Sequence, residues 1–253
     1  MGRFKVGVQF EPQHCSVDDL RAAWRAAEAM GADSLFTWDH FFPLHGDPDG
    51  THYEGWSLLG AMACDTSRAS VGLLVSCTSY RSPDLTADMA RTLDHVSGGR
   101  LILGIGAGWF ERDYDEYGFA FGTPASRLEA LERDIVRMRA RFGRLNPPPR
   151  GRLPLMIGGE GERVTLRITA EHADMWNGFG PIERFIHKNG VLNDWCGRVG
   201  RDPAAIERTV LLNGRGDLEG VDAFVQAGAR VVIVPARAPF DLSDVERVLA
   251  ARG

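Results

Sequence analysis

The dipeptide Asp39-His40 places two residue types suited to proton transfer side by side, directly after an apolar segment at residues 34–38 that is predicted to be a strand. Histidine titrates near neutral pH and is the commonest general acid or base, and a neighbouring carboxylate can orient its ring. A loop histidine that only bonds backbone groups is the alternative. His14, His45 and His52 lack the helical spacing of a zinc protease, so no metal site is predicted.

A second candidate is the run Gly158-Gly159-Glu160-Gly161, which joins a predicted strand at residues 155–157 to a predicted helix at residues 164–173. Backbone N–H groups at the start of a helix favour an anion, so this turn predicts a phosphate site. Glycines that serve only a tight connection are the alternative. Glu160 and Glu162 would repel an anion, and we expect both side chains to face solvent.

Three more glycines, at positions 104, 106 and 108, follow a predicted strand at residues 101–103. Their spacing is not the Gly-x-Gly-x-x-Gly of dinucleotide-binding folds, and we expect a loop rather than a helix after them. Glycine lets the backbone approach a ligand closely. We therefore interpret this stretch as a platform for a planar ring, with Trp109 at its rim.

The expected loop carries four acidic side chains that fit a solvated surface, and their spacing selects no catalytic residue among them: Glu111, Asp113, Asp115 and Glu116. Cys77 is expected to be a small buried hydrophobic residue rather than a nucleophile, because no base is identifiable near it. Trp38, Trp109 and Trp176 fall at or beyond predicted strand ends, where indoles serve as core residues or as neighbours of a planar ligand.

These residues need a scaffold that gathers strand ends. Predicted strands alternate with amphipathic helices along the chain, from a strand at residues 4–10 to a helix at residues 245–250. Ser16 is expected to cap the first helix, and Gly190 to break the one at residues 182–199. Such alternation predicts a parallel sheet, and eight strand-helix units in 253 residues favour a closed (β/α)8 TIM barrel with its site at the carboxyl ends of the strands. We expect a single domain, 1–253.

Composition narrows the class of function. The formal net charge is −5 and the charged fraction 25%, which is typical of a globular protein and gives no basic footprint for nucleic acid. No apolar run is long enough to span a membrane, and no secretory signal is visible at the N-terminus. The four cysteines lie far apart, so reduced thiols in a cytoplasmic protein are expected.

Four segments together resemble the luciferase-like family of flavin and deazaflavin oxidoreductases. They are Trp38-Asp39-His40-Phe41; residues 72–75 with Tyr80-Arg81-x-Pro83; residues 93–109; and Ile157-Gly158-Gly159 with Ala173-Asp174-x-Trp176-Asn177. The resemblance implies the same barrel, with a flavin-type ring in its mouth and the phosphate at Gly158-Gly159. It also implies a non-proline cis peptide at Leu74-Val75 that backs the ring.

The Asp-His form at positions 39 and 40 is nearer to the branch that uses coenzyme F420, an 8-hydroxy-5-deazaflavin, than to the luciferases. The resemblance therefore implies hydride transfer between F420 and an organic small-molecule substrate, with His40 and Asp39 as catalytic residues and Trp109 in the substrate pocket. The implied cofactor-binding residues are Asp39, Leu74, Val75, Gly106, Ala107, Ile157, Gly158, Gly159, Trp176 and Asn177. A homodimer is expected by the same resemblance.

Two alternatives stay open: an FMN-dependent monooxygenase of the same fold, and a shortened paralogue that binds cofactor without turnover. The chain departs from the family in ways that bear on substrate. Sugar-phosphate dehydrogenases of the F420 branch carry Glu where Trp109 stands, and a Lys after the sixth strand where this chain has Phe179-Gly180-Pro181. The insertions that usually roof the pocket are reduced here to residues 146–152 and 213–217.

Overall fold

The strands of this protein form one closed parallel sheet. The computed structural model describes residues 2–253, and its strands run in the order β3-β2-β1-β9-β8-β7-β6-β5-β4, with a further pairing of β3 with β5. β3 and β4 are two parts of one barrel strand, so the sheet closes as the predicted (β/α)8 barrel. The bounds of the strands are β1 Lys5–Phe10, β2 Ser34–Thr37, β3 Ser70–Leu73, β4 Ser76–Cys77, β5 Leu101–Gly106, β6 Leu155–Gly158, β7 Met175–Phe179, β8 Glu207–Leu211 and β9 Val231–Ala236.

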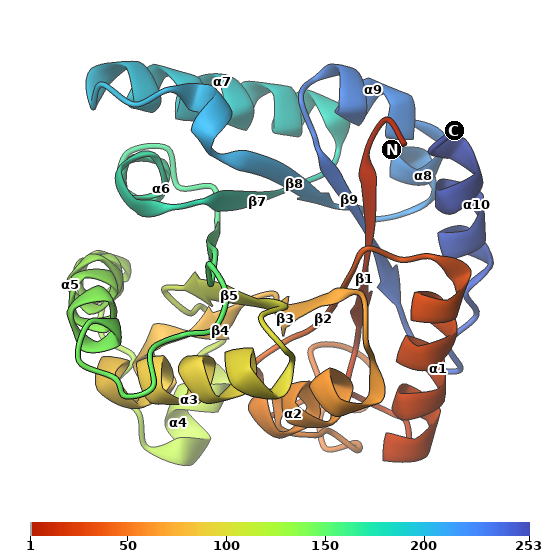
Figure 1. Cartoon of the computed structure of the whole chain (residues 1–253), viewed down its shortest axis with the longest axis horizontal. Helices are drawn as coiled ribbons and strands as arrows, with labels where there is room; N and C mark the ends of the chain where they lie inside the picture. The colour runs from red at the N-terminus through yellow and green to blue at the C-terminus, as the bar shows by residue number, and fades with distance from the viewer. Residues whose placement is uncertain (1) are drawn as a thin grey trace.

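The helices surround this sheet in chain order, from α1 round to α10 (Figure 1). They bury apolar stripes against the outer face of the strands, while a smaller apolar cluster that includes Phe36, Ile102 and Met156 forms a separate group. The bounds are α1 Val17–Met30, α2 Gly55–Asp65, α3 Pro83–Val96, α4 Glu111–Tyr117, α5 Pro124–Phe142, α6 Thr165–His172, α7 Ile182–Arg198, α8 Arg215–Glu219, α9 Val221–Gln226 and α10 Ser243–Ala251, with 3-10 turns at Thr78–Tyr80 and Pro203–Ala205.

Helix starts follow the expected capping chemistry. The Ser16 side chain accepts a hydrogen bond from the backbone of Asp19, whose carboxylate accepts one from the Ser16 backbone, and Gly31 ends α1 in the left-handed region at φ 110°. The Ser82 hydroxyl caps α3 ahead of Pro83. These local contacts set where each helix begins, and therefore where the preceding strand delivers its carboxyl end.

Two sequence predictions about helices were wrong. Residues 111–117 form α4 and not a loop, because burial of Asp113 and Tyr114 holds one face of this short helix against the barrel and Gly118 ends it at φ 69°. α7 passes through Gly190 without a break, because its buried residues Phe185 and Leu192 outweigh the cost of about 1 kcal/mol for a helical glycine.

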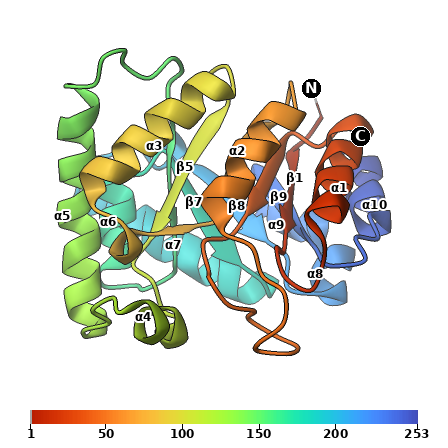
Figure 2. The same ribbon diagram turned by 90° about the horizontal axis from the view of Figure 1, so that it is seen from below.

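α4 and the long connection between β2 and α2 project from the same end of the barrel, away from the two chain termini (Figure 2). This end receives the carboxyl ends of the parallel strands. None of the helices within residues 2–253 combines the length and the apolar character that crossing a membrane requires.

Candidate functional site

A cavity of about 440 Å³ opens among the carboxyl ends of the strands. Concave sites of roughly 300–1,000 Å³ with a few convergent polar groups are typical for small ligands. Most residues singled out from the sequence line it: Asp39, His40, Leu74, Val75, Gly106, Ala107, Trp109, Gly158, Gly159 and Asn177. The fold therefore brings together residues from five different strand ends and the loops that follow them.

Ile157 and Trp176 are the two predicted site residues that do not line this cavity. Both are fully buried in the cluster between strands and helices. The Trp176 indole stacks on Phe185 with ring centroids 5.6 Å apart, and its Nε1 donates to the carbonyl of Gly159 at 3.0 Å. Trp176 thus supports the glycine turn from behind rather than offering a surface to a ligand.

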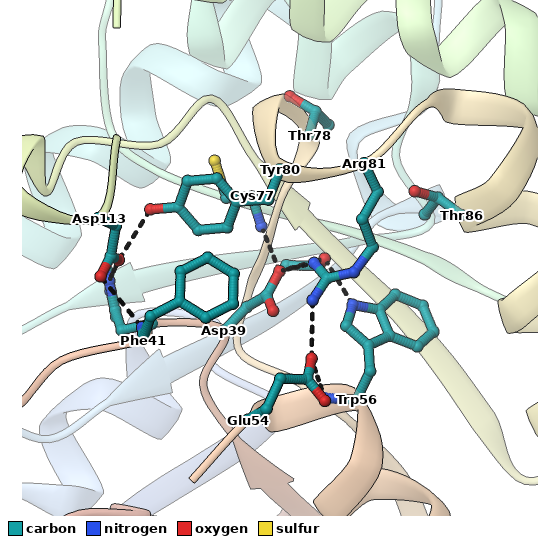
Figure 3. Close-up of polar contacts among 12 residues, drawn as sticks. Asp39, Phe41, Glu54, Trp56, Cys77, Thr78, Tyr80, Arg81, Thr86 and Asp113 are labelled. Atoms are coloured by element: carbon teal, nitrogen blue, oxygen red, sulfur yellow. Dashed lines mark hydrogen bonds and ion pairs between the residues drawn. The ribbon is translucent and has the colours of Figure 1, made fainter. Parts of the chain in front are cut away.

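His40 is held by a carboxylate from another part of the chain. Its Nδ1 lies 2.7 Å from Oδ2 of Asp113. The same Oδ2 accepts a hydrogen bond from the Tyr80 hydroxyl at 2.8 Å, and Oδ1 accepts one from the Phe41 backbone N–H at 3.0 Å. Figure 3 shows the Tyr80 hydroxyl and the Phe41 backbone nitrogen both directed at Asp113. Asp113 is fully buried, so it is not part of a solvated acidic surface.

Sequence reasoning missed Asp113 because residues 111–117 were expected to be a loop. Within a helix, positions three and four apart share a face. Phe110, Asp113, Tyr114 and Tyr117 have this spacing, so a helical interpretation would have placed Asp113 on one face with three aromatic residues. That pattern was the available signal.

Asp39 faces a different set of partners. Its Oδ2 accepts from Arg81 Nη1 at 2.8 Å, from the Ser76 hydroxyl at 2.7 Å and from the Cys77 backbone at 3.0 Å, and Arg81 continues to Glu54 at 2.7 Å (Figure 3). Burial raises the pKa of Asp39, and the Arg81 charge opposes that rise. The other oxygen, Oδ1, is buried and has no donor among the described residues.

The floor of the cavity is made by the interruption between β3 and β4. The peptide bond between Leu74 and Val75 is cis, as the family resemblance implied, and the Leu74 carbonyl accepts a hydrogen bond from Gln9 Nε2 at 2.9 Å. A Cβ added at Gly106 would lie 2.8 Å from the Val75 side chain, and one at Gly158 would lie 3.0 Å from it. These glycines therefore make room for Val75, and the floor of the cavity consists of Leu74 and Val75 together with the backbone of the two glycines.

The turn after β6 contributes another part of the cavity lining. Gly158, Gly159 and Thr165 line the cavity, and Gly159 takes φ 123°, a backbone region that favours glycine. α6 begins only at Thr165, so the turn is longer than the sequence suggested. Arg127, from α5, is the one Arg or Lys that lines the cavity within residues 2–253.

Glu160 does not face solvent, contrary to expectation. It is 9% exposed, and its Oε1 accepts from the Phe179 backbone at 2.9 Å while Arg184 pairs with Oε2 at 2.5 Å. Its charge is thus compensated within the fold and does not repel an anion in the turn. Glu162 does lie at the surface, where Lys188 and His187 bond its Oε1 at 2.6 and 2.9 Å.

Comparison with protein families supplies the context for this geometry. Residues 3–213 match the model of the luciferase-like monooxygenases. The chain belongs to this family. A phthiodiolone/phenolphthiodiolone dimycocerosates ketoreductase of Mycobacterium tuberculosis is 29% identical over 241 residues, which cover 79% of this chain and 62% of the relative. The chain therefore spans less than two thirds of the length of such curated relatives.

Two solved structures share the barrel over 98% of this luciferase-like chain and 97% of their own, each at 14% identity. One is an F420-dependent secondary alcohol dehydrogenase in complex with an F420-acetone adduct, with a TM-score of 0.86. The other is the coenzyme F420-dependent tetrahydromethanopterin reductase of Methanopyrus kandleri, with a TM-score of 0.75. At this identity the likeness shows the fold.

The mouth of this luciferase-like barrel is apolar at its rim. Trp109 is 63% exposed, and its ring lies 5.5 Å from the His40 ring and 5.4 Å from Phe110, measured between centroids. Phe179, the last residue of β7, also lines the cavity and opens the Phe179-Gly180-Pro181 stretch that lacks the cation of the sugar-phosphate dehydrogenases. Trp109 and Phe179 thus contribute aromatic surface to the cavity.

Proposed function

We propose that this protein is an F420-dependent oxidoreductase that transfers a hydride between the deazaflavin cofactor and an organic substrate at the carboxyl-end mouth of the barrel. The observation that carries the proposal is the pairing, on one cavity, of a Leu74-Val75 floor with a His40 imidazole whose Nδ1 is engaged by Asp113. The names of the two F420-dependent structural neighbours and of the ketoreductase relative support the same chemistry.

The lining residues fit a ring of this type. Leu74 and Val75 present an apolar surface, while Asp39 Oδ1 is a buried acceptor without a donor, which an N–H group of a bound ring would satisfy. Gly158, Gly159, Thr165 and Asn177 would take the phosphate end, where free backbone N–H groups suit an anion. When bound, F420 supplies or accepts the hydride.

His40 handles the proton that accompanies the hydride. In the direction of carbonyl reduction, the imidazole gives a proton to the substrate oxygen, and in the direction of alcohol oxidation it takes that proton back. Asp113 keeps the ring in place on the side away from the substrate. Trp109 and Phe179 would line the substrate side, which favours an apolar substrate that bears a carbonyl or hydroxyl group.

Titration with F420 and, in parallel, with FMN tests the proposal through quenching of each cofactor's fluorescence. We expect F420 to bind with a Kd below tens of micromolar and FMN to bind more weakly. The absence of F420 binding in that range would overturn the proposal. Binding of FMN together with oxygen uptake would instead support an FMN-dependent monooxygenase of the same fold; a riboflavin lyase whose structure contains modified FMN is also a structural neighbour, with a TM-score of 0.67.

Asp39→Asn sharpens this titration. Ser76, Arg81 and the Cys77 backbone all donate to one oxygen of Asp39, so the carbonyl of an Asn would take that position and its NH2 group would replace Oδ1, the oxygen without a donor. A donor would then meet the N–H of the ring, and leaving such groups unpaired costs about 1–3 kcal/mol. We expect F420 affinity to fall about 10-fold to 100-fold. The surface variant Asp115→Asn should leave it unchanged, and an unchanged Kd in Asp39→Asn would refute the assignment.

Two broader parts of the proposal concern the assembly and the setting of the protein. A homodimer is proposed from the family resemblance and is tested by analytical ultracentrifugation. A reducing, cytoplasmic setting fits the four cysteines, all of which are free thiols in the structure.

A further inference from the structure

Asp113 has three hydrogen-bond partners and forms no ion pair with Lys or Arg within the part of the chain that the structure describes. Phe41 N donates to Oδ1, the Tyr80 hydroxyl donates to Oδ2, and His40 Nδ1 lies 2.7 Å from the same Oδ2. Accepting from every side is the pattern of an ionised carboxylate, which has no proton to donate. Burial raises the pKa of Tyr80, so its hydroxyl keeps its proton and donates it to this oxygen.

This arrangement determines which nitrogen of His40 carries the proton in the neutral ring. A carboxylate that only accepts requires an N–H at Nδ1, and a neutral imidazole has one N–H, so Nε2 is left as a lone-pair acceptor. Nε2 has no hydrogen-bond partner among residues 2–253, and His40 lines the cavity. The rings of Trp109 and Phe110 stand edge-on to the imidazole at 73° and 87°, which limits its rotation.

We propose that Asp113 is a positioning residue that fixes His40 in the Nδ1–H tautomer and thereby makes Nε2 the atom that exchanges a proton with the substrate. The tautomer itself does not depend on any cofactor. Its role in turnover rests on the proposed oxidoreductase function. Asp113 lies 73 residues from His40 in the sequence, so the pairing exists only because α4 folds back against the end of β2.

Asp113→Asn inverts the donor pattern with little change in volume. The Phe41 N–H can only donate to Oδ1, so an Asn carbonyl would keep that position; the NH2 group would then face His40 Nδ1 and the Tyr80 hydroxyl, which can rotate to accept. A donor at that position requires a lone pair on Nδ1, so the imidazole proton moves to Nε2. The variant should therefore present an N–H, and not a lone pair, to the cavity.

Nitrogen-15 NMR of protein labelled at histidine reads the tautomer directly, at a pH where the rings are neutral. His40→Gln identifies the His40 resonances among the seven histidines of the chain. We expect Nδ1–H in the wild type, Nε2–H in Asp113→Asn and Nδ1–H in Asp115→Asn, the matched control on the exposed side of α4. An Nε2–H wild type, or an Asp113→Asn spectrum that keeps Nδ1–H, overturns the proposal.

The wild-type spectrum decides the tautomer even where a variant folds poorly, and Tyr80→Phe provides a second variant. It removes one donor from Oδ2 and leaves the carboxylate, so His40 should stay Nδ1–H; a change of tautomer would contradict the role given to Asp113. With F420 bound and a turned-over substrate in hand, Asp113→Asn should lower kcat about 10²-fold to 10⁴-fold without weakening F420 binding. Failure to bind F420 would remove the proposed function and leave the tautomer result standing.

Discussion

Two carboxylates stand near the mouth of the barrel, and each has its own partners. Asp39 is adjacent to His40 in sequence, yet its hydrogen bonds go to Arg81, Ser76 and the Cys77 backbone. The His40 ring is bonded by Asp113 instead. Sequence adjacency therefore misleads here, because consecutive residues at the end of a strand point to opposite sides.

His52, in the connection between β2 and α2, is a second histidine whose hydrogen bonding and pKa are set by the fold. The Trp38 indole donates to His52 Nε2 at 2.9 Å, and burial lowers the pKa of His52 from 6.5 to about 4. The folded state thus prefers the neutral ring. Because the unfolded chain binds more protons between pH 6.5 and pH 4, this contribution is fully present above pH 6.5 and is lost as the pH falls toward 4.

We expect His52→Gln to flatten that part of the stability profile, because the amide oxygen can still accept from Trp38 and does not titrate. Between pH 7 and pH 5 the wild type should lose up to about 1–2 kcal/mol more than the variant, an amount reduced by solvent screening of a partly exposed ring. Urea denaturation at the two pH values measures it. Equal losses in both proteins would show that His52 is not held neutral by the fold.

At the scale of elements, the strand periodicity was more informative than the family resemblance about the orientation of Trp176. Side chains alternate between the two faces of a strand. Met175 belongs to the smaller apolar cluster and Asn177 lines the cavity, so the intervening Trp176 must point outward to the helices, as observed. Applying that alternation would have excluded Trp176 from the lining of the cavity before the structure was known.

Strands, helices and the barrel were predictable because their signals are local: apolar periodicity, Ser and Thr caps, and Pro at helix starts. The position of Asp39 and His40 in the cavity lining was predictable because barrel cavities open at strand ends. The pairings of Asp113 and of the buried Glu160 were not predictable, since their partners, such as Tyr80 and Arg184, lie on other elements. No local pattern specifies such pairings.

Two glycines, one in a strand and one in a helix, test whether a glycine is needed where another backbone segment lies close to it. A Cβ at Gly104 of β5 would lie 2.0 Å from the Leu73 carbonyl oxygen, whereas nothing lies within 4 Å of the corresponding position at Gly190 in α7. We expect Gly104→Ala to destabilise the protein by about 3 kcal/mol or more, because a backbone contact cannot yield easily. Gly190→Ala should stabilise it by about 0.5–1 kcal/mol.

Denaturation midpoints and m values for both variants check these signs. A neutral Gly104→Ala would mean that β3 and β5 can separate without cost, and a destabilising Gly190→Ala would mean that α7 needs flexibility at its centre.

At the scale of the whole molecule, the cavity is lined from β2, the break between β3 and β4, β5, β6, β7, β8 and α5. A ligand that occupies it contacts elements from both halves of the chain, so its binding energy opposes global unfolding rather than the opening of one loop. A ligand bound only to the folded state at 100 times its Kd adds about 2.7 kcal/mol to the free energy of unfolding.

We therefore expect saturating F420 to raise Tm by about 5–10 °C, since 1 kcal/mol corresponds to about 2–4 °C in a chain of this size. Thermal melts with F420, with FMN and without cofactor measure the shift. The Asp39→Asn variant should show a smaller increase in Tm than Asp115→Asn at the same F420 concentration, because Asp39 lines the cavity and Asp115 does not. Equal shifts in the two variants would mean that F420 binds elsewhere on the barrel, and a shift with FMN alone would assign the cavity to the flavin.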